Sequence, residues 1–179
     1  MADEPRPHAR EEPELESRRE IYRAVRDSPG VHFRGLLREL DYAQGTLQYH
    51  LRWLVDEGLV EADDDGEYTR YYAAEFEPDD RAVMAALRRQ YSRRIVAVLA
   101  ADGPATTSDL AERLDRAPST ISWHLSKLHD AGVVTRTRAG QSVEYALADR
   151  DRVMRLYTVH RRSLTDRLVD NVLGIWDEY

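Results

Sequence analysis

The sequence contains no cysteine, which excludes disulfide bonds, thiolate metal sites and thiol catalysis. It has no apolar run of about 18 residues and no signal-peptide core, so we expect a cytoplasmic protein that neither spans a membrane nor is exported by that route. Motifs for a catalytic nucleophile, a phosphate-cradling glycine loop or a carboxylate–histidine cluster are also missing. These absences argue against an enzyme, and the sequence predicts no cofactor and no metal.

Lysine is almost absent: Lys127 is the only one among 26 bases, which face 33 acids. Abundant acid with arginine in place of lysine is typical of a halophilic proteome from a GC-rich genome, although an ordinary acidic surface is the alternative. The net charge of −7 normally argues against nucleic acid as a partner. The local distribution of charge must therefore decide which partners are possible.

One segment of the chain occurs twice. Residues 45–60, "GTLQYHLRWLVDEGLV", return as "STISWHLSKLHDAGVV" at 119–134, an offset of 74 positions. The same offset relates Ile21 to Ile95 and Tyr71 to Tyr145 without a gap. An internal repeat of this length indicates that one small domain is built twice. We call residues 17–76 copy one and residues 91–148 copy two.

Each copy predicts three helices followed by a hairpin. The first helix covers about 17–27 or 91–101; in copy one a capping box of Ser17 and Glu20 opens it, and "SPG" or "DGP" ends it. The second helix has one apolar face, formed by Phe33, Leu36, Leu37 and Leu40 or by Leu110, Ala111 and Leu114, and Thr106 with Asp109 caps it in copy two.

The third helix turns its apolar residues inward, namely Leu47, Leu51, Leu54 and Val55 or Ile121, Leu125 and Leu128. Gly58 and Gly132 follow as left-handed C-caps. The apolar period then changes to two, with turns at Asp65-Gly66 and Ala139-Gly140, which predicts a β-hairpin. The fold class is therefore mainly α with small β-hairpins: two tandem winged helix-turn-helix domains plus a long C-terminal helix.

The connecting segments complete the domain organisation. Residues 1–16 mix proline with charges of both signs and are expected to be a disordered tail. A linker helix over 78–90 should continue into copy two as a single rod. Residues 149–179 predict a terminal helix whose apolar stripe needs a partner. Pairing with a second subunit, to give a homodimer, is the favoured interpretation; folding back along the linker helix is the alternative.

The third helix of copy two carries the most specific signal. "APSTISWHLSKLHDAGVV" resembles the recognition-helix signature of ArsR-like winged-helix transcription regulators, with a Ser/Thr-rich start, a His-Leu pair and a Gly-Val entry into a strand. The resemblance covers about 130 residues as two copies, an arrangement that occurs among archaeal regulators. It implies binding to double-stranded DNA. The family's thiol metal-sensing motif is missing, so it does not imply metal sensing.

In this fold the third helix enters the major groove of DNA, and its outward residues can contact bases and phosphates. The candidates in copy two are Ser119, Thr120, Ser122, Trp123, Ser126 and Lys127, with Arg136 and Arg138 in the wing. In copy one they are Gln44, Thr46, Gln48, Tyr49 and Arg52. The alternative is an ordinary solvated helix face. We expect Trp123 and Tyr49 to pack on the hairpin rather than stack on a base.

The two copies differ sharply in charge. Residues 39–68 hold one base, Arg52, against nine acids, a net charge of −8, whereas the aligned residues 113–142 hold five bases against two acids, a net charge of +3. A wing with the sequence "EADDDGE" repels a phosphate backbone, and one with "TRTRAGQS" attracts it. The sequence therefore predicts that copy two (helix 118–131, wing 134–146) is the main DNA-binding copy.

Two histidines, His50 and His124, occupy equivalent positions in the third helices. A paired-histidine metal site is the weaker interpretation, because each copy offers one such histidine without a carboxylate at ligand spacing. A half-buried histidine bonded to backbone or touching a phosphate is favoured. Overall, the leading hypothesis is a sequence-specific DNA-binding transcription regulator; the alternative is a protein-interaction adaptor that has lost contact with DNA.

Overall fold

The computed structural model describes residues 16–164, which form two compact units. Unit one holds residues 16–27 and 31–75, and unit two holds residues 28–30 and 76–164 of the described chain. The predicted tail falls on residues 1–15, outside the described residues, as do residues 165–179 of the expected terminal helix. Among the helices of residues 16–164, none has the length and hydropathy needed to span a bilayer.

Unit one contains copy one. Its elements are α1 (Glu16–Asp27), β1 (Val31–His32), α2 (Phe33–Glu39), α3 (Gln44–Asp56), β2 (Val60–Asp64) and β3 (Thr69–Ala73). The strands form an antiparallel sheet in the order β1-β3-β2. Ile21, Leu36, Leu47 and Leu54 are fully buried and join the helices into one core. Each such side chain stabilises the fold by roughly 1.5–3 kcal/mol.

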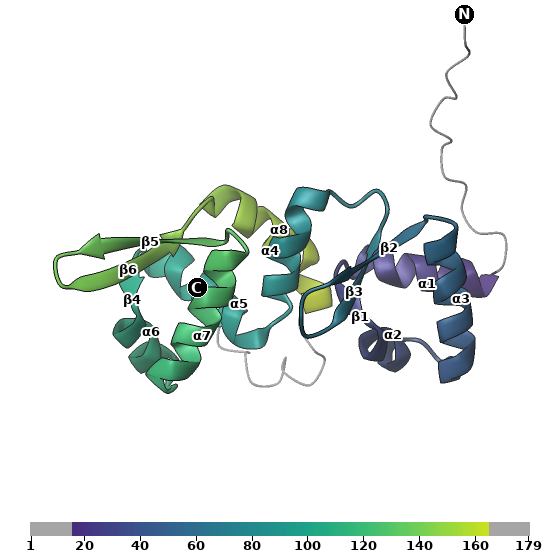
Figure 1. Ribbon diagram of the computed structural model, residues 1–179, viewed down its shortest axis with the longest axis horizontal. Helices are drawn as coiled ribbons and strands as arrows, with labels where there is room; N and C mark the ends of the chain where they lie inside the picture. Colours follow the sequence, from purple (N-terminus) through teal and green to yellow (C-terminus); the bar gives the residue numbers. More distant parts are fainter. Residues whose placement is uncertain (1–15, 165–179) are drawn as a thin grey trace, which may run out of the picture. The chain divides into compact units, whose positions relative to one another are not determined.

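Unit two contains copy two and two flanking helices (Figure 1). Its elements are α4 (Pro78–Leu87), α5 (Gln90–Asp102), β4 (Ala105–Thr106), α6 (Thr107–Leu114), α7 (Pro118–Asp130), β5 (Val134–Ala139), β6 (Ser142–Leu147) and α8 (Arg150–Leu164). The sheet order, β4-β6-β5, repeats that of unit one. Ile95, Leu110, Ile121, Leu125 and Leu128 are fully buried between α5, α6 and α7. The predicted winged helix-turn-helix fold is confirmed for both copies.

Glycine ends the third helix in both copies, as predicted. Gly58 and Gly132 adopt φ angles of +67° and +69°, which side chains with a Cβ rarely adopt. The Leu59 amide then donates to the Leu54 carbonyl and the Val133 amide to the Leu128 carbonyl, satisfying carbonyls that the helix leaves open. The glycines thus turn each chain from the third helix directly into the first strand of its hairpin.

The caps of the other helices agree only in part with the sequence prediction. The capping box of Thr106 and Asp109 is present at α6. The capping box predicted for Ser17 is wrong, because α1 already begins at Glu16 and Ser17 lies inside its first turn. In copy one the His32 imidazole caps α2 instead of a hydroxyl: its Nδ1 accepts a hydrogen bond from the Gly35 amide at 2.8 Å.

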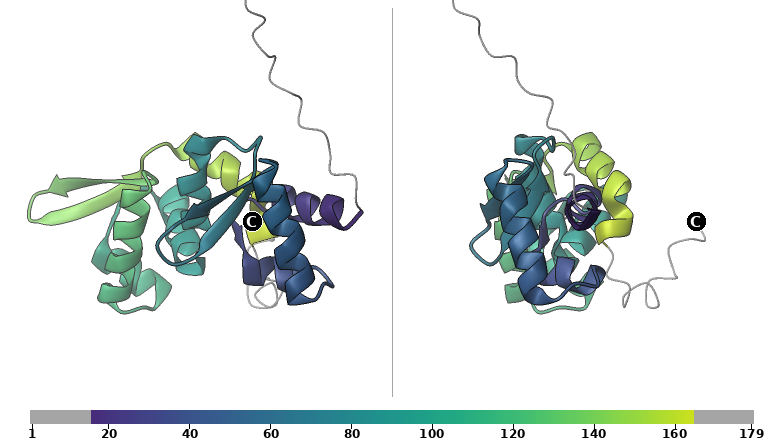
Figure 2. Two further views of the ribbon diagram at one scale, coloured as in Figure 1. Left: turned by 45° about the vertical axis from the view of Figure 1, so that its right-hand side comes forward. Right: turned by 90° about the vertical axis from the view of Figure 1, so that its right-hand side faces the viewer.

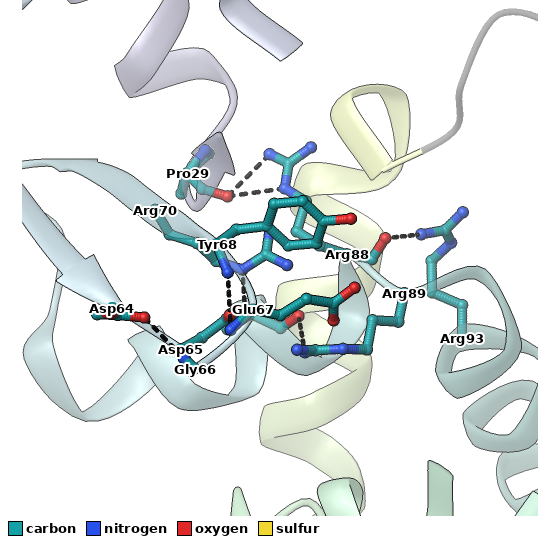
Figure 3. Close-up of polar contacts among 11 residues, drawn as sticks. Pro29, Asp64, Asp65, Gly66, Glu67, Tyr68, Arg70, Arg88, Arg89 and Arg93 are labelled. Carbon is teal, nitrogen blue, oxygen red and sulfur yellow. Dashed lines mark hydrogen bonds and ion pairs between the residues drawn. The ribbon is translucent and has the colours of Figure 1, made fainter. Parts of the chain in front are cut away.

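The linker is not the single rod that we expected. It consists of α4 and α5, and Arg89 between them has an extended backbone (φ −86°, ψ 123°). Arginine side chains bind the carbonyls exposed at this break. Arg93 donates to the carbonyl of Arg88 (Figure 3) and to that of Leu87, each at 2.9 Å, and Arg89 donates to that of Ala85 at 3.1 Å. These bonds satisfy the end of α4 without a glycine or proline.

Helix α8 packs on α4 within unit two (Figure 2). Its Val153, Leu156 and Leu164 are buried, and its Arg152 Nε donates to Asp80 at 2.6 Å. The His160 ring lies against Phe76 with 5.9 Å between the ring centres. For residues 150–164 the structure thus has the arrangement that we gave as the alternative, in which the helix folds back along the linker.

Candidate nucleic-acid interface

Three buried residues of α7, Ile121, Leu125 and Leu128, determine which side of the helix faces solvent. The exposed residues of α7 include five of the predicted contacts: Ser119, Ser122, Trp123, Ser126 and Lys127. Thr120 is half-buried. Trp123 is 48% exposed, so about half of its side chain is open to solvent. The Lys127 ammonium lies 5.8 Å from the centre of its ring, within cation–π range.

His124 fixes α7 against α5 from the inner side. It is 8% exposed, and its Nδ1 lies 3.2 Å from the hydroxyl of Ser92, which is fully buried. The rings of Trp123 and Tyr91 contact the imidazole, with centres 4.8 and 5.6 Å away. His124 therefore acts as a buried hydrogen-bonded residue that orients the third helix.

A cationic cluster that sequence reasoning missed lies beside α7. The Arg116 Nε donates to the Tyr91 hydroxyl at 2.5 Å, and its guanidinium carbon is 4.9 Å from the Tyr91 ring centre. The guanidinium carbon of Arg94 is 5.7 Å from the same ring centre. The signal for the cluster was the position of Tyr91, one turn before Arg94.

The wing of copy two carries its arginines on one face. Arg136 and Arg138 alternate along β5, where they pair with Tyr145 and Val143 of β6. Both side chains are exposed. The Arg138 Nε donates weakly to the Gly140 carbonyl at 3.3 Å, near the tip of the hairpin. Two exposed guanidinium groups on a projecting hairpin can bind phosphates along one strand of a duplex.

In copy one the predicted contacts Gln44, Thr46, Gln48, Tyr49 and Arg52 are all exposed on α3. Tyr49 is 63% exposed, so most of its side chain is open to solvent. The Arg52 guanidinium lies 3.9 Å from Asp56 one turn later, and the side chains of both are mostly exposed. Such a pair contributes little to stability, so Arg52 can bind another acceptor.

His50 has surroundings unlike those of His124. The position equivalent to Ser92 is Arg18, whose guanidinium carbon lies 3.6 Å from the ring centre of Trp53. Within residues 16–164 the buried His50 Nδ1 has no hydrogen-bond partner. Burial, and then the charge of Arg18, lower the pKa of His50 below its ordinary value. No group of three potential metal ligands occurs among the described residues.

The cationic cluster also changes in copy one. Glu20 stands at the position of Arg94, Tyr42 at that of Arg116, and Ser17 at that of Tyr91. The Tyr42 hydroxyl donates to the Glu20 carboxylate at 2.5 Å, and this hydrogen bond raises the pKa of Tyr42. The two cations that flank α7 are therefore replaced by a carboxylate and a phenol beside α3.

The wing of copy one is organised around Asp65. Its carboxylate accepts hydrogen bonds from the amides of Glu67 and Tyr68 and from the buried Arg70 (Figure 3). Burial acts to raise the pKa of Asp65, but these three donors outweigh it and hold the pKa below its ordinary value. Arg70 is 3% exposed and is thus a structural partner of the turn rather than a group that can bind phosphate.

The linker arginines take part in internal bonds. Besides the bonds of Arg89 and Arg93, the Arg88 guanidinium donates to the carbonyls of Pro29, at 2.8 and 3.0 Å, and of Ser163, all within unit two (Figure 3). Arg88 and Arg89 therefore bind backbone carbonyls and do not form a freely solvated charged face. Arg94 differs from Arg88, Arg89 and Arg93, because its guanidinium lies against the ring face of Tyr91.

Comparisons with known proteins agree with two domains. A family model described as an N-terminal HTH domain matches residues 15–84, and one described as a helix-turn-helix domain matches residues 91–137. The chain is 30% identical over 130 residues to the uncharacterized HTH-type transcriptional regulator MJ1398 of Methanocaldococcus jannaschii, covering 73% of this chain and 33% of that protein. Over 46 residues it is 44% identical to MJ0774 of the same organism, which carries the same description, covering 26% of this chain and 11% of that protein.

Solved structures show similar folds over part of the chain. HlyU from Vibrio cholerae is 24% identical with a TM-score of 0.42, covering 47% of this chain and 90% of that one. The homodimeric winged helix-turn-helix DNA-binding domain Mb0332 from Mycobacterium bovis, a possible ArsR-family regulator, is 23% identical with a TM-score of 0.42, covering 56% and 87%. With one helix-turn-helix domain in each unit and a hairpin wing on both, the chain contains two winged helix-turn-helix domains.

Proposed function

We propose that this protein is a sequence-specific, double-stranded DNA-binding transcription regulator in which copy two makes the main contact with DNA. Helix α7 enters the major groove, where Ser122, Ser126 and Lys127 face the base edges and phosphates. Arg136 and Arg138 of the wing bind the phosphate backbone. The proposal includes no catalytic activity and no cofactor, and it places the protein in the cytoplasm.

The cationic cluster extends this interface. Arg94 and Arg116 lie against Tyr91, next to the ring cluster of His124 and Trp123. We infer that the two guanidinium groups bind a backbone phosphate next to the point where α7 enters the major groove. Stacking on Tyr91 holds both groups in place, which reduces the conformational entropy lost when a phosphate binds.

The observation that carries the proposal is the reversal of charge between equivalent positions. Glu20 of copy one corresponds to Arg94, Ala62 to Arg136, and Asp64 to Arg138. One domain scaffold thus presents cations to a polyanion in copy two, where copy one has two carboxylates and an alanine. Copy one either contributes weakly to DNA binding or contacts another partner.

Homodimerisation belongs to the proposal as well. Paired subunits match palindromic half-sites, and part of the apolar stripe predicted for residues 149–179 lies outside the described residues. Light scattering in high salt tests this part, and a monomeric mass would contradict it.

The central test compares two double variants by DNA titration at several salt concentrations. Arg136→Ala with Arg138→Ala should weaken binding strongly and reduce the salt slope by roughly two, because each lost phosphate contact removes about one unit. Gln48→Ala with Arg52→Ala is the matched pair in copy one and should have little effect. Equal losses would contradict the assignment.

The adaptor function remains the second candidate because the charge of copy one suits a cationic protein better than DNA. Footprinting of a promoter fragment in molar KCl separates the two. Specific protection supports DNA binding, whereas no protection together with a co-purifying protein supports the adaptor.

A further inference from the structure

Unit one has a hollow on the outer side of α3 that the proposed DNA contact does not use. It has a volume of about 400 Å³ and lies between α2, α3 and the β2–β3 hairpin. Phe33, Leu51, Val55, Ala62 and Tyr71 form its apolar walls. The volume falls within the range of about 300–1,000 Å³ that small-molecule sites occupy.

The walls of the hollow are specific to copy one. The positions equivalent to Phe33, Val55 and Ala62 are Thr107, His129 and Arg136 in copy two. The sheets confirm one of these equivalences: Ala62 pairs with Tyr71 as Arg136 pairs with Tyr145. The surface that is polar and basic in copy two, the copy suited to DNA, is thus apolar and aromatic in copy one.

Three polar side chains line the rim. Gln44, Gln48 and Arg52 follow one another at intervals of four residues, so they form one row along α3. The glutamine amides can each donate and accept hydrogen bonds. Burial raises the pKa of Tyr71, so its hydroxyl stays protonated and neutral.

The surrounding charge determines which ligands fit. Residues 31–73, which span the elements around the hollow, hold four bases against nine acids, a net charge of −5, and the base at the hollow, Arg52, lies 3.9 Å from Asp56. An anion approaching the rim is repelled by these carboxylates, whereas an uncharged molecule is not. The aromatic walls favour a flat ring, and the two amides favour a ligand with amide-like hydrogen-bonding groups.

We propose that this hollow of copy one binds a small, uncharged aromatic molecule, with its ring between Phe33, Val55 and Tyr71 and its polar group on Gln44 and Gln48. A bound ligand covers the row of α3 that corresponds to the groove-facing residues of α7. Its regulatory meaning rests on the proposed division of roles between the copies; the binding site itself does not.

The test uses the full chain without DNA and two probes of nearly equal shape, benzamide and benzoate, which differ in charge. Two-dimensional NMR follows the side-chain amides of Gln44 and Gln48 and the methyl groups of Leu51 and Val55. Benzamide should shift these signals in a saturable manner, and benzoate should bind at least several-fold more weakly. No shift with benzamide, or equal binding of both probes, would overturn the proposal.

Two variants test whether benzamide binds in this hollow. Ala62→Arg and Val55→His introduce the residues that copy two carries at these positions, so the domain fold accommodates them. Each should abolish the benzamide shifts while the melting temperature changes little. Ala97→Arg, which adds the same charge to an exposed site on α5 of unit two, should leave binding unchanged. Shifts that persist in both hollow variants would overturn the site.

The experiment is independent of DNA binding. If benzamide fails to bind while the Arg136 and Arg138 variants lose DNA affinity, the ligand site is refuted and the proposed function stands. The opposite pair of results refutes the proposed function and leaves the ligand site intact.

Discussion

Copy one and copy two share a core and differ at the surface that faces outward from the third helix. Leu47, Leu51 and Leu54 are buried in copy one as Ile121, Leu125 and Leu128 are in copy two. Around α7 the exposed positions hold serines, lysine and arginine, whereas around α3 they hold glutamines, a tyrosine and many carboxylates. The difference shows that a repeated domain can keep its packing while the side chains of its outer face change.

The largest expected effect comes from exchanging the cationic cluster. Arg94→Glu with Arg116→Tyr gives copy two the residues of copy one, and DNA affinity should fall by two orders of magnitude or more, because a carboxylate then faces the phosphates. Fluorescence anisotropy with a promoter fragment measures the loss. The reciprocal change, Glu20→Arg with Tyr42→Arg, is the control, and a gain smaller than threefold there is expected. A loss below threefold in copy two would contradict the role of the cluster.

The shared core can be compared by removing equivalent leucines. Leu51→Ala and Leu125→Ala each create a cavity at a buried site and should each lower the free energy of unfolding by about 2–5 kcal/mol. Denaturant unfolding followed by NMR, residue by residue, reports on the two units separately. Costs that differ by more than the width of that range would show that the cores are not equivalent.

A smaller loss of stability is expected at a buried position where the two copies differ. Ser92→Ala removes the hydroxyl that lies 3.2 Å from the His124 Nδ1, leaving a buried polar group without its partner, at a cost of about 1–3 kcal/mol. Thermal unfolding measures it. Ser108→Ala, on the exposed face of α6, is the matched control and should cost much less. If both variants melt alike, the buried contact contributes no stability.

The smallest effect separates the two wings by pH. Because the folded state lowers the pKa of Asp65, its contribution is complete above the ordinary value of about 3.9 and is lost as the pH falls through the lowered pKa. Exchange of the Glu67 and Tyr68 amides should therefore accelerate in acid, relative to an Asp65→Asn variant. The wing of copy two has Ala139, which lacks a carboxylate, at the position equivalent to Asp65. Exchange of its Gly140 amide should therefore show no corresponding acceleration in acid.

The sequence predicted what depends on periodicity and on special backbone angles. Gly58 and Gly132 marked the ends of the third helices, and the change from a helical to an alternating pattern predicted both hairpins. The strands β1 and β4 were missed because two residues are too few to show alternation. The break at Arg89 was missed because arginine side chains, rather than glycine or proline, satisfy the end of α4.

The candidate site was predicted in part. The outward face of α7 follows from the buried leucine spacing, and the wing arginines follow from the strand period. The cluster of Tyr91, Arg94 and Arg116 joins residues of α5 to the residue that precedes α7 by two positions, so tertiary packing alone brings it together.

The residue that begins each helix-turn-helix has two tasks at once. His32 pairs with Arg70 in the sheet and caps α2, and Thr106 pairs with Glu144 and caps α6. If a bound partner displaces the wing, the movement is therefore transmitted to the first turn of the second helix in the same domain. Either the strand pairing breaks or the helix cap opens. A displacement of the hairpin therefore changes the helices of its domain directly, without a separate hinge.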